Sequence, residues 1–133
     1  MSHHRLNVHL LLIWATVILA CTNPYYEPIF KVGIDTINSD IQEVVKTHDI
    51  SIEGHKAPLD DKVITSLSIQ LINAQDIDVS TDSLIKIQRM VAKKVKSRLK
   101  DSLQYDEYWM IFIKKDSLSE GGCFPNRFKA TEL

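Results

Sequence analysis

The sequence predicts an α+β domain of two layers, in which a three-stranded antiparallel sheet is backed by two helices in the order α-β-β-α-β. Three observations support this fold class: two segments with apolar residues at helical spacing, two neighbouring segments with strand-like alternation, and one short run that is apolar throughout. The charge is nearly balanced, with 16 Lys and Arg against 17 Asp and Glu. The composition therefore gives no reason to expect nucleic acid as a partner.

The first helix and a hairpin are expected to open the domain, for which we assign residues 32–116. From Ile34 onward apolar residues recur every three or four positions, which predicts a short amphipathic helix. Residues 50–56 and 63–73 alternate between apolar and polar, and the turn-forming residues 58–61 separate them, so a β-hairpin should follow. One side of its second strand is apolar and the other carries Ser and Gln. The helices should therefore cover only one face of the sheet.

The strongest helix pattern runs from about Thr81 to Leu103, with the apolar residues on one side. Next to them a basic stripe occupies about 80° of the helical wheel. It consists of Lys86, Arg89, Lys93, Lys96 and Lys100. Such a stripe could contact anionic lipid or glycan. The interpretation we favour is a solvated face, in which lysine stems shield the apolar edge and the last cations complement the helix dipole.

Residues 108–113 form the most hydrophobic strand candidate after residue 21, and they are apolar on both faces. If the helices cover one face, the alternating set on the other face needs a second cover. That set is either Tyr108, Met110 and Phe112 or Trp109, Ile111 and Ile113. The segment 117–133 is expected to be a C-terminal tail or an extra strand. Its residues 118–133 are the expected cover, and a partner protein is the alternative. We take Trp109, Ile111 and Ile113 as the candidate partner surface.

A short apolar run from Leu10 to Cys21 predicts that the chain is exported. The run follows a modestly basic start and has the length of a signal-peptide core. A membrane-spanning helix would need about 20 apolar residues. Residues 1–20 are therefore expected to be a signal peptide. Residues 21–31, with two prolines and two tyrosines, are expected to be a linker.

The end of this run, Ile18-Leu19-Ala20-Cys21, resembles the lipobox of bacterial lipoprotein precursors. A branched aliphatic residue stands three positions before Cys21 and Ala directly before it, whereas Leu19 departs from the usual small residue. The resemblance implies diacylglyceryl transfer to the Cys21 sulfur, cleavage before Cys21 and acylation of the new amino terminus. A lipid in the outer membrane or elsewhere in the cell envelope would then anchor the exported protein. An ordinary signal peptide cut near Ala20 and an uncleaved buried helix are the alternatives.

The domain itself, over residues 34–115, resembles small uncharacterised lipoproteins of Bacteroidetes-type bacteria in its hairpin, its basic helix and the run Y-W-M-I-F-I-K-K. These proteins supply no activity that can be transferred to this chain. The resemblance therefore supports the expected location at the cell envelope and implies no biochemical activity.

Chemistry-bearing residues are sparse, and the sequence shows none of the common catalytic or cofactor motifs. If Cys21 carries lipid, Cys123 is a free thiol, and with His48 and His55 it is too small a set for a zinc site. We therefore expect a lipid-anchored, non-catalytic interaction protein without metal or cofactor. Its partners would be the membrane, through Cys21, and an envelope protein. The alternatives are a small envelope enzyme or thiol-dependent protein that uses Cys123, and a binder of anionic lipid or glycan.

Overall fold

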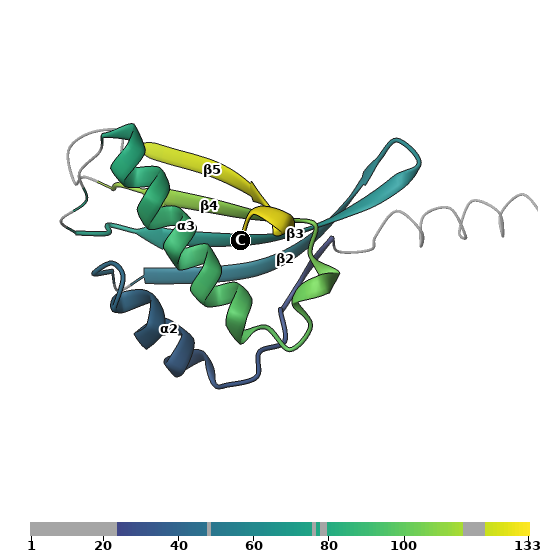
Figure 1. Cartoon of the computed structure of the whole chain (residues 1–133), viewed down its shortest axis with the longest axis horizontal. Helices are drawn as coiled ribbons and strands as arrows, with labels where there is room; N and C mark the ends of the chain where they lie inside the picture. Colours follow the sequence, from purple (N-terminus) through teal and green to yellow (C-terminus); the bar gives the residue numbers. More distant parts are fainter. Residues whose placement is uncertain (1–23, 48, 76, 78–79, 116–121) are drawn as a thin grey trace, which may run out of the picture.

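The computed structural model describes residues 24–47, 49–75, 77, 80–115 and 122–133, and these form a sheet and a helical layer (Figure 1). The helices are α2 (Ile34–Gln42) and α3 (Thr81–Arg98). The strands are β1 (Tyr25–Tyr26), β2 (Asp49–Leu59), β3 (Lys62–Ile72), β4 (Glu107–Ile113) and β5 (Cys123–Lys129). Two 3-10 turns, η1 (Ser102–Gln104) and η2 (Ala130–Glu132), precede β4 and follow β5.

The sheet has five strands in the order β1-β2-β3-β4-β5. All neighbours are antiparallel except β3 and β4, which are parallel. The α+β class is confirmed, whereas the predicted three-stranded antiparallel sheet is wrong in size and in one strand direction. The direction differs because α3 carries the chain back between β3 and β4, and a crossover helix of this kind joins parallel strands. The two further strands lie at the edges, β1 within the predicted linker 21–31 and β5 within 117–133.

The predicted hairpin is present as β2 and β3, which pair along their whole length from Asp49 opposite Ile72 to Leu59 opposite Lys62. Asp60 lies in the turn with a φ of 51°, in the left-handed region that aspartate tolerates better than most residues. Because β4 pairs with β3 only from residue 66 onward, the end of the hairpin projects beyond the neighbouring strands (Figure 1). We call residues 57–64 the hairpin tip.

The second helix ends at Arg98, earlier than the predicted Leu103. At Leu99 the backbone becomes extended, with a ψ of 138°, and the side chain enters the core. The Lys31 amide donates to the Arg98 carbonyl oxygen at 2.8 Å, so one of the orphan carbonyls at the helix end is satisfied by the segment before α2. Residues 24–31, for which the sequence predicts a linker, thus contact the domain, through β2 at Tyr25 and Tyr26 and through the end of α3 at Lys31.

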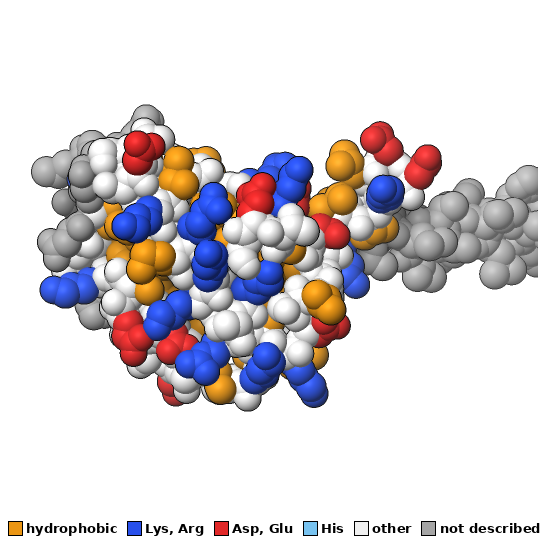
Figure 2. Space-filling view, viewed as in Figure 1, with side chains coloured by type: hydrophobic (Ala, Val, Ile, Leu, Met, Phe, Trp, Pro, Cys, Tyr) orange, Lys and Arg blue, Asp and Glu red, His pale blue; other side chains and the backbone are white. Residues whose placement is uncertain are grey.

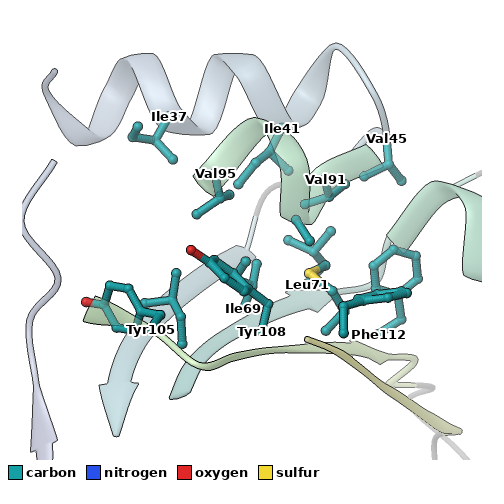
Figure 3. Packing of buried hydrophobic residues seen from close by; sticks show 14 of the residues in the cluster. Ile37, Ile41, Val45, Ile69, Leu71, Val91, Val95, Tyr105, Tyr108 and Phe112 are labelled. Carbon is teal, nitrogen blue, oxygen red and sulfur yellow. The ribbon is translucent and has the colours of Figure 1, made fainter. Parts of the chain in front are cut away.

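One core fills the space between the helices and the sheet (Figure 3). Figure 3 shows Tyr108 and Phe112 of β4 on the side of the sheet that faces the helices, together with Ile69 and Leu71 of β3. The largest fully buried side chains come from both layers: Tyr105, Tyr108, Ile37, Ile41, Leu67, Ile69, Leu71, Leu99, Met110, Gln88, Val91 and Val95. Side chains alternate along a strand, so Trp109, Ile111 and Ile113, which lie between the buried residues of β4, point to the opposite face of the sheet.

Candidate functional site

The sheet face that points away from the core, which we call the open face, carries no helix in the described part of the chain. On this face the strand register places Trp109, Ile111 and Ile113 of β4 opposite Arg127, Pro125 and Cys123 of β5. The three β4 side chains are half-buried. The structure thus brings the predicted partner surface together on one face and adds Pro125 beside it.

Trp109, near the start of β4, is held in place on this face by charged neighbours. Its indole Nε1 donates to Glu107 Oε2 at 3.1 Å, and the Arg127 guanidinium lies 4.7 Å from the ring centroid. Arg127 and Glu107 also form an ion pair of 3.6 Å across the two strands. A hollow of about 270 Å³ adjoins the ring, with Ile111 and Pro125 in its lining. The arrangement is a fixed aromatic ring with an apolar depression beside it and a charged pair at its edge.

The segment 117–133 was expected to cover such a face, but within residues 122–133 it forms the edge strand β5. Gln88 of α3, which is fully buried, holds this strand to the helical layer. Its Nε2 donates to the Phe124 carbonyl oxygen at 2.9 Å, and its Oε1 accepts from Asn126 Nδ2 at 3.1 Å. The strand therefore widens the sheet and leaves the open face without a lid in this part of the chain.

The predicted basic stripe divides into two groups. Arg89 and Lys96 donate hydrogen bonds to main-chain oxygens of η2, at 3.3 and 2.7 Å. Lys86, Lys93 and Lys100 are exposed, and Figure 2 shows Lys and Arg side chains spread along α3. Two cations of the stripe are thus engaged within the domain, and contact of the others with anionic lipid or glycan stays a prediction.

Lys94 and Arg98 of α3, which flank the basic stripe, also have partners within the domain. Arg98 Nε donates to Asp40 Oδ2 at 2.6 Å, and Lys94 Nζ lies 2.6 Å from Glu43 Oε2. The hydrogen bond and the charge of Arg98 hold the pKa of the Asp40 carboxyl below its usual value. These ion pairs join α2 and its C-cap residue Glu43 to α3, and they reduce the excess positive charge of the helical face.

The Cys123 thiol and the His55 imidazole, the thiol and imidazole within the described residues after Pro24, do not form a pair. Cys123 is exposed at the edge strand β5, opposite Ile113. His55 lies on β2, three strands away and toward the other end of the sheet, with its ring centroid 5.0 Å from that of Tyr25. His48 and Cys21 lie outside the described residues. Within the described ranges, no three His, Cys, Asp or Glu side chains gather in a way that could hold a metal ion.

The buried tyrosines are packing groups. Burial raises the pKa of Tyr108 to about 12, and burial is also the main cause that raises the pKa of Tyr105. Both phenols are therefore harder to deprotonate than an exposed tyrosine. Their rings contact each other with centroids 6.1 Å apart, and both belong to the core. Neither is placed to exchange a proton with a substrate near neutrality.

Sequence reasoning missed a second hollow, of about 400 Å³, at the end of the sheet where β3 and β4 finish. Its lining includes Leu84 of α3, Phe112 of β4, Phe124 of β5 and Lys114. A crevice at the carboxyl ends of parallel strands is a frequent ligand site in open sheets. A purely antiparallel sheet has no pair of parallel strands that end side by side. This hollow could therefore not be predicted from the expected antiparallel sheet.

Comparison with known proteins adds no relative: no protein-family model, curated protein or solved structure matches the chain. In the described residues no helix is both long and apolar enough to cross a membrane. The functional interpretation therefore depends on the residues and their geometry.

Proposed function

We propose that this chain is a lipid-anchored protein of the cell envelope whose domain binds a protein partner through the open face and catalyses no reaction. One observation carries the proposal: Trp109, Ile111 and Pro125 form a connected apolar surface on the open face, which no helix covers within the residues that the structure describes. Tryptophan and arginine are enriched among the residues that dominate protein–protein binding, and here Arg127 lies over Trp109. The hollow beside the ring would accept an apolar side chain of the partner.

Membrane attachment is the second part of the proposal, and it rests on the lipobox-like residues Ile18 to Cys21. Each acyl methylene that enters the bilayer contributes about 0.8 kcal/mol, so several chains on one residue hold a protein firmly. The mature chain would be exported and would stay at the envelope while its domain recruits a partner.

The two alternative functions have less support. A thiol-dependent activity would need a base beside Cys123, and His55 lies at the other end of the sheet. Binding of anionic lipid or glycan through the helical face would depend on Lys86, Lys93 and Lys100, because the other two cations of the stripe contact η2.

Photo-crosslinking in intact cells tests the open face. A benzoylphenylalanine at Ile111 is expected to give one adduct of defined mass, with a yield that falls about tenfold when Trp109 is also changed to Ala, equivalent to about 1.4 kcal/mol of binding. The same label at Lys93, on the helical face, is the control and should give no such adduct. Equal adducts from both positions, or an adduct at 111 that ignores Trp109→Ala, would contradict the proposed surface.

A further inference from the structure

Three parts of the chain meet at the end of the domain where the described residues begin. The Lys56 amide donates to the Pro24 carbonyl oxygen at 3.0 Å. Lys56 pairs with Thr65, whose carbonyl oxygen accepts from the Asp106 amide at 2.8 Å. Pro24, the base of the hairpin and the turn before β4 therefore lie in a row across this end of the sheet. The hairpin tip projects beyond that row (Figure 1).

This end is unusually rich in exposed apolar side chains. Seven large apolar residues are strongly exposed in the described part of the chain, and four belong to this end. They are Tyr25, Leu59, Val63 and Leu103, with exposed fractions of 55%, 60%, 63% and 92%. Figure 2 shows the apolar side chains of the hairpin tip next to charged ones. Exposed apolar residues concentrated at one end of a domain indicate that this end contacts another surface.

The positions of Leu59 and Val63 favour insertion of the tip into a lipid layer over binding of a protein on one of its faces. Leu59 pairs with Lys62 and Pro58 with Val63, so Leu59 and Val63 project from opposite faces of the two-stranded tip. A protein that docks on one face would cover only one of them. A tip that enters a lipid surface end-on buries both.

We propose that this end of the domain faces the bilayer, with Leu59 and Val63 in its interfacial layer. The proposal rests on the proposed lipid anchoring and adds an orientation to it. Cys21 precedes Pro24 by three residues, and three residues of chain span at most about 11 Å. A lipid on Cys21 therefore keeps this end of the sheet within reach of the headgroups.

The charges at the tip set the depth of this contact. Lys62 can extend its ammonium toward the headgroups while its stem lies along apolar surface. Asp60 and Asp61 oppose entry into hydrocarbon, so the tip stays in the headgroup layer. The strands then run roughly along the membrane normal, and the open face is accessible to a partner from the side.

Tryptophan quenching by brominated lipid tests the orientation. The mature acylated protein with Trp109→Phe and Leu59→Trp is reconstituted into vesicles of phosphatidylethanolamine, phosphatidylglycerol and brominated phosphatidylcholine. The matched control carries Trp109→Phe and Met90→Trp, because Met90 is 45% exposed on α3. We expect quenching at position 59 to exceed that at position 90 by about threefold or more, since quenching needs contact with the bilayer.

The possible outcomes distinguish a wrong orientation from a missing lipid anchor. Equal quenching at positions 59 and 90, in protein whose acylation is verified by mass, overturns the orientation and leaves the lipid anchor standing. Protection of the tip in intact envelopes without quenching in vesicles would assign it to a protein partner, which also overturns the orientation. An unacylated Cys21 overturns the proposed anchoring and this inference with it.

Discussion

Replacing Gly54 with alanine is expected to lower the free energy of unfolding by about 1–3 kcal/mol, the usual range for an overpacked site. A Cβ at Gly54 would lie 2.4 Å from Cζ of the Tyr26 ring, so the ring must move. That ring is stacked on Tyr105, with centroids 6.3 Å apart, and β1 depends on its position. Chemical denaturation measures the loss, and faster hydrogen exchange of the Lys56 amide, which bonds to Pro24, reports the release of β1.

Gly33→Ala is the matched control for this substitution. A Cβ at Gly33 meets nothing within 4 Å, and its φ of −66° suits alanine. The expected change in the free energy of unfolding is within about 1 kcal/mol, because the gain in unfolded-state entropy and the loss of a helix-cap glycine are both small. If both variants lose the same stability, the contact between Gly54 and Tyr26 does not hold β1.

Gln88→Met should destabilise the protein by about 2–4 kcal/mol, because it keeps the shape of the side chain and removes both of its hydrogen bonds. The Phe124 carbonyl and the Asn126 amide would lose their partner on the buried side of β5. Protease cleavage within β5 should rise together with the loss in thermal stability. Both effects are measured on the purified domain.

The control for Gln88 is on the same helix. Met90 is 45% exposed, so Met90→Ala should change the free energy of unfolding by no more than about 0.5 kcal/mol. A Gln88→Met variant as stable as Met90→Ala would mean that β5 is held by packing alone.

The elements with a strong local period were predictable from sequence, and the edge strands were not. Residues 63–73 alternate and form β3, and α3 follows its apolar stripe to Arg98. In contrast, β1 is a two-residue strand behind a proline, and its pairing depends on the glycine at position 54. The strand β5 contains Pro125, which interrupts a strand pattern but is tolerated at a sheet edge.

The part of the candidate site on β4 was predictable from the sequence, whereas the part on β5 was not. Two-sided apolarity between residues 108 and 113 predicted that one alternating set would need a cover, and Trp109 and Ile111 lie on the open face. The contribution of Pro125 and Arg127 could not be predicted, since it depends on the pairing of β4 with β5, and the sequence predicts residues 117–133 only as a tail or an extra strand. The parallel direction of β4 was not predicted because the apolar pattern of residues 108–113 carries no direction, and antiparallel neighbours are the more common arrangement.

The lipid on Cys21 is the claim on which the location and the orientation depend, and the mass of the first tryptic peptide tests it most directly. Detergent-extracted protein from the envelope should yield residues 21–31, ending at Lys31, with diacylglycerol on the Cys21 sulfur and an acyl chain on the amino group. The Cys21→Ser variant should lack both groups and leave the membrane fraction. A peptide that starts at another residue, or an unmodified Cys21, would contradict the account.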